Sequence, residues 1–286
     1  MEQVEIFEVA PRDGLQNEKR LIPTAEKIAL VDLLSQAGFR RIEVASFVSP
    51  KWVPQMADSA EVLAGITRGQ GISYAALTPN MKGLEGAIAA RADEIAIFAS
   101  ASEGFSKANL NCTIDESFDR FAPVAAAARE AGLPVRGYVS CVTDCPYDGQ
   151  IDPADVARVA ERLAELGCYE VSLGDTIGQA EPVRLGQMLD TVLTVLPADK
   201  LAGHYHDTAG RALANIEVSL DKGLRVFDAA VGGLGGCPYA PGAAGNVATE
   251  AVHARLTELG FATGLNPDIL TKAATYARQI RGAPNA

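Results

Sequence analysis

Short apolar runs alternate along the whole chain with longer segments whose apolar residues recur at helical spacing, and this alternation limits the folds available. Eight runs have the length and composition of buried strands: Val4–Val9, Arg41–Ala45, Ile72–Leu77, Glu94–Phe98, Val135–Val139, Glu170–Leu173, Leu201–His206 and Val226–Ala230. Eight strand–helix units in 286 residues are typical of an α/β fold of the (β/α)8 TIM barrel type. A doubly wound open sheet also alternates, but it usually has fewer strands at this length and gathers its ligand motif at one crevice.

The segments between the runs carry helix start and stop signals, such as prolines in a first turn and glycines just past an end. Helices are expected at Thr24–Gln36, Pro153–Leu166, Pro182–Leu196 and Gly210–Lys222. Residues 266–281 form an extra C-terminal helix beyond the eighth unit, which we expect to cap the barrel or to serve in dimerisation. Because no linker divides the chain, we expect residues 1–286 to form a single TIM-barrel catalytic domain.

The charge balance and the cysteine content restrict the partners that the chain can bind and the cellular compartment in which it is expected. The chain has 36 acidic and 25 basic residues, which argues against binding nucleic acid or an anionic membrane. It has no apolar stretch of about 20 residues that could cross a membrane. The N-terminal segment is acidic where a signal peptide would be basic and then apolar, and five cysteines are an odd number that suggests reduced thiols. We therefore expect a cytoplasmic globular protein.

Two of the three histidines lie at the end of the seventh run, in the segment HYHD. Residues i and i+2 of a strand point to the same side, so His204 and His206 present two imidazoles together. One interpretation is a hydrogen-bonded histidine pair at the barrel mouth. We favour a divalent metal site, because imidazole is a common metal ligand.

Oxygen ligands for such a metal follow other runs. Asp13 comes directly after the first run, which barrel closure brings close to the seventh, although a turn residue before Gly14 is a competing interpretation. Asn246 follows the eighth run, at the end of a glycine-rich loop. Two nitrogens and two oxygens differ from the ligands of structural zinc and suit a six-coordinate Mg²⁺ or Mn²⁺ with two positions left for substrate.

Four further side chains belong to the same face of the predicted barrel. Cys237 lies within a long glycine loop, where a thiol is more often reactive than structural. Glu43 stands in an apolar run, so we expect it to pair with Arg12 or to act at the metal. Arg12 can place a permanent cation over a developing oxyanion. Asp175 either caps the turn that follows it, or acts on a substrate proton or orients a histidine.

Most of these residues fall within five strings that resemble those of the hydroxymethylglutaryl-CoA lyase family, a branch of the metal-dependent DRE-TIM lyases; Glu43 and His204 lie two residues before two of the strings. The strings are APRDGLQNE, ASFVSPKWVPQMAD, SLGDTIG, HDTAGRALAN and GGLGGCPYAPGAAGNVATE. They occur in the family's order over about residues 4–250. RDG and HxHDT are shared across the wider superfamily, whereas the cysteine loop marks the lyase branch.

The resemblance implies a pyruvate carboxyltransferase-like barrel that holds one Mg²⁺ or Mn²⁺ through Asp13, His204, His206 and Asn246. It implies that Arg12 stabilises an enolate and, with Gln16, binds the substrate. It further implies that Glu43 supports the metal and Arg12. Asp175 and Cys237 would serve in proton transfer.

The implied reaction is retro-Claisen cleavage of the acyl-CoA (S)-3-hydroxy-3-methylglutaryl-CoA to acetoacetate and acetyl-CoA, as in leucine catabolism and ketone-body formation. The resemblance also implies a homodimer. Three positions depart from the family pattern: Tyr205 stands for a cysteine, Pro241 for a lysine and Ala251 for an acid. None of them removes a proposed catalytic group.

Three alternatives remain open at the level of the sequence. The enzyme could cleave an analogue with a longer 3-substituent, such as isohexenyl. It could be a condensing synthase of the kind that makes 2-isopropylmalate or homocitrate, although those chains usually carry further C-terminal domains. A metal-dependent acyl-CoA binder without catalysis is the third, and the presence of Arg12, Asp175 and Cys237 argues against it.

Overall fold

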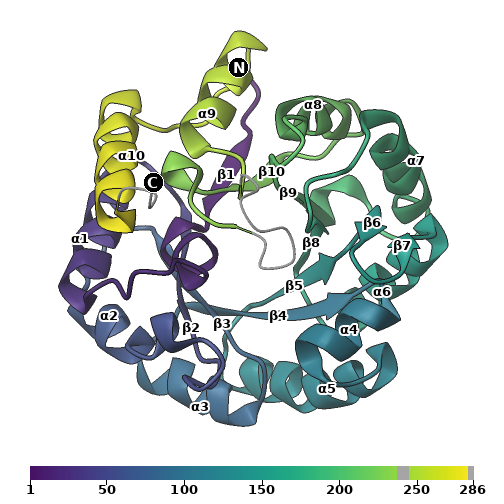
Figure 1. Ribbon diagram of the computed structural model, residues 1–286, viewed down its shortest axis with the longest axis horizontal. Coiled ribbons are helices and arrows are strands. Elements are labelled where there is room, and N and C mark those ends of the chain that lie inside the picture. The colour runs from purple at the N-terminus through teal and green to yellow at the C-terminus, as the bar shows by residue number, and fades with distance from the viewer. Residues whose placement is uncertain (237–244, 283–286) are drawn as a thin grey trace.

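The computed structural model describes residues 1–236 and 245–282, and eight of its strands close into a parallel barrel ringed by helices (Figure 1). Around the barrel the strands follow the order β1-β10-β9-β8-β5-β4-β3-β2. Their bounds are β1 (Glu5–Glu8), β2 (Arg41–Ser46), β3 (Ser73–Leu77), β4 (Glu94–Ser100), β5 (Val135–Ser140), β8 (Glu170–Asp175), β9 (Leu201–Tyr205) and β10 (Val226–Ala229). All eight strands predicted from the apolar runs are confirmed, with ends that differ by one or two residues.

The helices lie outside the strands. They are α1 (Thr24–Leu34), α2 (Ser59–Gly65), α3 (Met81–Ala89), α4 (Glu103–Leu110), α5 (Ile114–Glu130), α6 (Pro153–Glu165), α7 (Pro182–Val192), α8 (Ala212–Asp221), α9 (Thr249–Glu258) and α10 (Pro267–Arg281). The signals read from the sequence act as expected in α6, where Pro153 opens the helix and the Asp152 side chain accepts the backbone N–H of Ala154. The extra C-terminal helix α10 packs against α1 and α9 (Figure 1).

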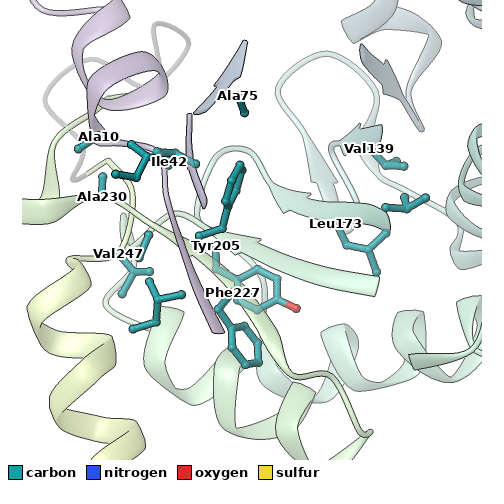
Figure 2. Close-up of a cluster of buried hydrophobic side chains, with 14 of the residues drawn as sticks. Ala10, Ile42, Ala75, Val139, Leu173, Tyr205, Phe227, Ala230 and Val247 are labelled. Carbon is teal, nitrogen blue, oxygen red and sulfur yellow. The ribbon is translucent and has the colours of Figure 1, made fainter. Parts of the chain in front are cut away.

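Apolar and polar side chains alternate along the barrel strands, and the apolar ones face the helices. Tyr205 shows the direction, because its hydroxyl lies 2.8 Å from Ser219 Oγ on α8. Figure 2 shows part of this buried outer layer, in which the labelled side chains include Ile42, Val139, Leu173, Tyr205 and Phe227. Burial of this layer against the helices is the main source of stability for the fold.

The alternate positions on the same strands point into the barrel, and several of them carry charge. Arg136 on β5 reaches across to Asp228 on β10, with which β5 does not pair. Arg136 also donates to Glu170 at 2.7 Å, and Glu170 receives a second guanidinium from Arg41 at 2.9 Å. The barrel interior is therefore built from ion pairs in its middle and lower layers, below the ends of the strands where the candidate site lies.

Two local features were not predicted. A hairpin of β6 (Asp144–Cys145) and β7 (Gly149–Gln150) follows β5. The residues after β1 form a π-helix, η1 (Ala10–Gly14), whose backbone closes with a bond from Gly14 N–H to Val9 C=O at 3.1 Å. Single π-turns of this kind are often found at functional sites. In the described part of the chain, no helix is long and apolar enough to span a membrane.

Candidate active site

A cavity of about 830 Å³ opens at the carboxyl ends of the barrel strands. Its wall includes five residues that the sequence brought forward: Arg12, Asp13, Gln16, His204 and His206. In a TIM barrel this end of the strands carries the active site, because the βα loops converge there. The fold thus brings together side chains that lie almost 200 positions apart in the chain.

Asp13, His204 and His206 form a cluster with the geometry of a cation site. One potential ligand atom from each of the three lies within 4.8 Å of the others. His204 Nε2 is 3.8 Å from Asp13 Oδ2, and the two imidazole centroids are 5.5 Å apart. Both histidines are at least nine-tenths buried. Two imidazole nitrogens and a carboxylate suit a divalent metal ion, and the cluster is the one the sequence had suggested.

The two carboxylate oxygens of Asp13 have different surroundings. Oδ1 accepts hydrogen bonds from Arg12 Nη1 at 2.7 Å and from Gln16 Nε2 at 3.1 Å. Oδ2 faces His204 and accepts from Asn246 Nδ2 at 2.8 Å. Burial raises the pKa of Asp13, but the positive charge of Arg12 and the two histidines outweighs it and lowers the pKa to about 2. Asp13 is therefore ionised at neutral pH.

Asn246 lies beside the cluster, held by an antiparallel bridge between its backbone and that of His206. Its amide nitrogen donates to Asp13 and, at 3.2 Å, to the carbonyl of Leu234. Its Oδ1 is buried without a hydrogen-bond partner among the described residues. The metal-ligand role expected of Asn246 needs that oxygen, so the amide would have to turn about its last torsion when a cation is present.

Arg12 and Glu43 form the buried pair expected from the sequence. Arg12 donates from Nε to Glu43 Oε2 at 2.6 Å, and its Nη2 lies 2.5 Å from the same oxygen. Glu43 is fully buried and Arg12 is 5% exposed. Burial raises the pKa of Glu43 above its ordinary value, although Arg12 offsets part of the effect. The pair fixes the guanidinium at the wall of the cavity with Nη1 turned to Asp13.

Asp175 is the last residue of β8, and its carboxylate serves the loop that follows. The two oxygens accept backbone N–H groups of Gln179 at 3.1 Å and Ala180 at 3.0 Å. Gly174 and Thr176 line the cavity, but Asp175 does not. Burial raises its pKa to about 6. The two hydrogen bonds agree with the interpretation of Asp175 as a residue that caps the following turn. The raised pKa also allows the Asp175 carboxylate to exchange a proton near neutral pH.

Cys237 lies outside the described residues, as does Pro241. The loop is described up to Gly236, which lines the cavity and whose carbonyl accepts from Asn17 Nδ2 at 3.0 Å. The other four cysteines are buried: Cys112, Cys141, Cys145 and Cys168.

Three buried residues next to the cluster were missed by the sequence analysis. Asp228 Oδ2 lies 3.1 Å from His204 Nδ1, and Arg136 binds the same carboxylate. Tyr138 packs edge-on against the His204 ring, with its hydroxyl buried and without a hydrogen-bond partner among the described residues. For Asp228 and Arg136 the signal in the sequence was a charged residue inside an apolar run, the same signal that had singled out Glu43.

The surroundings of the two histidines shift their pKa values in opposite directions. Burial lowers the pKa of His204, but the hydrogen bond with Asp228 and the charge of Asp13 outweigh it, and the net shift is upward. Burial and the neighbouring His204 lower the pKa of His206 to about 4. His206 is therefore a neutral imidazole at pH 7 and can offer a lone pair to a cation.

Comparison with known proteins adds a family and close relatives. Residues 3–276 match the model of the family described as HMGL-like. The chain is 56% identical to the mitochondrial hydroxymethylglutaryl-CoA lyase of Bos taurus, over 97% of this chain and 85% of that protein. It is 54% identical to the 3-hydroxy-3-isohexenylglutaryl-CoA/hydroxy-methylglutaryl-CoA lyase of Pseudomonas aeruginosa, over 99% and 94%. Its structure is similar to that of the HMG-CoA lyase from Brucella melitensis, with a TM-score of 0.98, 64% identity and coverage of 99% and 100%.

Proposed function

The chain belongs to the HMGL-like family of lyases, and from this membership we propose that it cleaves (S)-3-hydroxy-3-methylglutaryl-CoA to acetoacetate and acetyl-CoA. The observation that carries the proposal is the cluster of Asp13, His204 and His206 beside the Arg12 guanidinium, at the wall of the cavity. A carbon–carbon lyase needs a Lewis acid near a hydroxyl and a cation near the developing enolate. The four side chains offer both within one site.

The donor set fits one Mg²⁺ or Mn²⁺, held by Asp13, His204, His206 and, after its amide turns, Asn246. The chemical fit lies in the ionised Asp13, the neutral His206 and the unpartnered Asn246 oxygen. When bound, the ion supplies Lewis acidity that makes a substrate hydroxyl more acidic. Which of the two ions serves in the cell does not affect the roles of the protein residues below.

Cleavage begins with loss of the proton from the tertiary hydroxyl of the substrate. We assign the base to Asp175, because a carboxylate with a pKa of about 6 is ionised at neutral pH yet basic enough to take a proton. Its neighbours Gly174 and Thr176 both line the cavity, and we propose that the proton reaches Asp175 through a relay at this wall.

The bond between C2 and C3 then breaks, and its electron pair passes into the thioester enolate of acetyl-CoA. Arg12 lies where it can hold that oxyanion, because Glu43 and Asp13 fix three of its nitrogens and leave the guanidinium at the cavity wall. Gln16 lines the same wall and is proposed to contact the substrate. Cys237, proposed from the sequence alone, donates a proton to the enolate carbon.

A longer 3-substituent is the second candidate, and an apolar cluster favours it. Leu77, Ala96 and Tyr138 form a small cluster apart from the main core, against which Val48 and Phe98 pack. All except Ala96 line the cavity. The P. aeruginosa relative is described as acting on both isohexenyl and methyl substrates. This apolar wall is suited to the burial of an alkenyl chain.

An assay of chelator-treated protein tests the proposal. Purified protein is given HMG-CoA with and without Mg²⁺ or Mn²⁺, and acetoacetate is measured. Metal-dependent release is expected. Folded protein that releases no acetoacetate with either metal would refute the proposed substrate, and the isohexenyl analogue and the reverse condensation would then be assayed.

The cytoplasmic location and the homodimer remain proposals, to be checked by fractionation and by light scattering.

A further inference from the structure

The imidazole of His204 lies between two carboxylates. Its Nε2 faces Asp13 Oδ2 at 3.8 Å, and its Nδ1 lies 3.1 Å from Asp228 Oδ2. Asp228 occupies the register position opposite His204 on the neighbouring strand β10, so the backbone pairing of β9 and β10 fixes this contact. The side of the ring away from the candidate metal site therefore has a definite partner.

Among the described residues, the other groups that form hydrogen bonds with the Asp228 carboxylate are donors. Arg136 donates from Nη1 to Oδ2 at 3.0 Å and from Nη2 to Oδ1 at 2.7 Å. The Ser172 hydroxyl donates to Oδ2 at 2.8 Å. A carboxylate bound in this way by a guanidinium is ionised and can only accept hydrogen bonds. It follows that the hydrogen in the contact with His204 belongs to Nδ1, which leaves Nε2 of the neutral ring with its lone pair toward Asp13.

Asp228 cannot turn away from His204, because its partner Arg136 is held on all sides. Arg136 is fully buried, and its Nε donates to Glu170 Oε1 at 2.7 Å. Its guanidinium also stacks on the rings of Phe7 and Tyr138, at 4.3 and 4.9 Å from their centroids. The Asp228 carboxylate is therefore held in place by Arg136 on one side, and His204 contacts it on the other.

The second histidine lacks such a support. His206 Nδ1 is buried and has no hydrogen-bond partner among the described residues. Its position comes from the backbone bridge to Asn246. Of the two imidazoles, only that of His204 has its protonated nitrogen specified by a neighbouring side chain.

We propose that Asp228, clamped by Arg136 and Ser172, is a positioning residue that keeps His204 protonated on Nδ1 and leaves Nε2 free to bind the divalent ion. The inference rests on the proposed metal-dependent function. Carboxylates that orient a ligating histidine in this way typically change metal affinity by about 10- to 100-fold when removed. Asp228 itself is not among the residues that line the cavity.

The variant Asp228→Asn keeps the shape of the side chain but replaces one carboxylate oxygen by an amide N–H₂. Oδ2 receives Ser172, Arg136 Nη1 and His204 Nδ1, so the amide oxygen takes that position and the N–H₂ faces Arg136 Nη2. Two donors then oppose each other, and the contact with His204 loses its charge. The preference of His204 for the Nδ1–H form should therefore weaken toward a mixture of the two neutral forms.

Glu94→Gln is the matched control. Glu94 is 4% exposed and also lies in the ionic network of the barrel, with hydrogen bonds to Ser73 and Tyr169. It has no described hydrogen bond to a histidine, and its change to glutamine removes the same formal charge. A general loss of buried charge would affect both variants alike, whereas loss of histidine positioning affects Asp228→Asn alone.

The test uses full-length, metal-free protein with ¹⁵N-labelled histidine, in which three histidines give a simple spectrum. At about pH 8.5, where neutral rings predominate, ¹⁵N–¹H correlation reports which nitrogen carries the proton, and His204→Gln assigns the signals. Mn²⁺ affinity is measured on the same proteins by electron paramagnetic resonance. We expect wild type and Glu94→Gln to show the Nδ1–H form of His204 and equal affinity. Asp228→Asn should show a mixture of the Nδ1–H and Nε2–H forms and bind Mn²⁺ about 10- to 100-fold more weakly.

Three results would overturn the inference. The first is a wild-type spectrum in which neutral His204 carries its proton on Nε2. This result would refute the proposed role of Asp228 even if the variant did not fold. The second is a folded Asp228→Asn protein with wild-type Mn²⁺ affinity, even if its melting temperature is lowered, because that is a merely structural role. The third is wild-type protein that binds no Mn²⁺, which would refute the proposed metal centre together with the support for it.

Discussion

Replacing Glu43 removes the buried partner of Arg12 and tests the ion pair that shapes the cavity wall. The hydrogen bond from Arg12 Nε and the ion-pair contact of Nη2 both end on Glu43 Oε2, and Glu43 is fully buried. In Glu43→Ala the guanidinium stays in place with Asp13 as its remaining carboxylate partner at 2.7 Å. In Glu43→Gln an amide oxygen can still accept one of the two lost bonds.

The expected cost follows from these contacts. Removal of one member of a buried ion pair costs about 3 to 5 kcal/mol. Because Asp13 still compensates part of the Arg12 charge, we expect Glu43→Ala to lie near the lower limit, about 3 kcal/mol. Glu43→Gln keeps one neutral hydrogen bond, so its cost should be about 1.5 to 3 kcal/mol. With an unfolding entropy near 0.6 kcal/mol per kelvin for 286 residues, 3 kcal/mol lowers the melting temperature by roughly 5 °C.

Thermal unfolding followed by circular dichroism measures these shifts, with the exposed Glu85→Ala as a control that should stay within about 0.5 kcal/mol. Arg12→Gln alone and combined with Glu43→Gln completes a double-mutant cycle. The double variant should lose less free energy of unfolding than the sum of the two single variants, because it leaves neither charge of the pair buried without its partner. A shift below about 1 °C for Glu43→Ala, or additive single effects, would contradict the buried-pair reasoning.

Three further predictions concern the proposed chemistry. His206→Ala should lose Mn²⁺ affinity by more than about 100-fold, the upper limit for residues that only support a ligand; an unchanged titration would remove it from the ligand set. Cys237→Ser should fold and bind metal normally yet lose most turnover, because a hydroxyl is a far weaker acid than a thiol; wild-type kcat would exclude the thiol. Wild-type kcat/KM should fall as the pH drops through about 6, where Asp175 takes up a proton, and Asp175→Asn should lack this dependence; persistence of the same limb would assign it to another group.

The barrel could be predicted because its strands are covered on the outside by helices and are read as apolar runs even where single charges interrupt them. Strand ends shifted slightly: β2 runs to Ser46 and β4 to Ser100, since backbone pairing continues into polar residues. The hairpin β6–β7 was missed because strands of two residues have no detectable periodicity. The π-turn of η1 was missed because its residues carry no pattern that separates it from an ordinary turn.

At the site, the sequence analysis identified the residues whose types are typical of metal ligands. It missed the residues whose role depends on their position in the fold. His204 and His206 form a recognisable pair, and Asp13 follows a strand end. Asp228 and Arg136 are single charges in apolar runs, 92 positions apart, and their contact exists only because the barrel closes. The direction of the Asn246 amide likewise depends on Asp13, a residue from the other end of the chain.

The π-turn after β1 also limits how this chain can change length. Loops at the carboxyl end of a barrel usually tolerate insertions and deletions. Here the turn holds one more residue than an α-helical turn would, and Arg12 and Asp13 lie inside it. Loss of a single residue before Arg12 would restore the ordinary turn and rotate the following side chains by about 100°. The guanidinium and the carboxylate would leave the cavity together, so the length of this short segment is as restrictive as the identity of its residues.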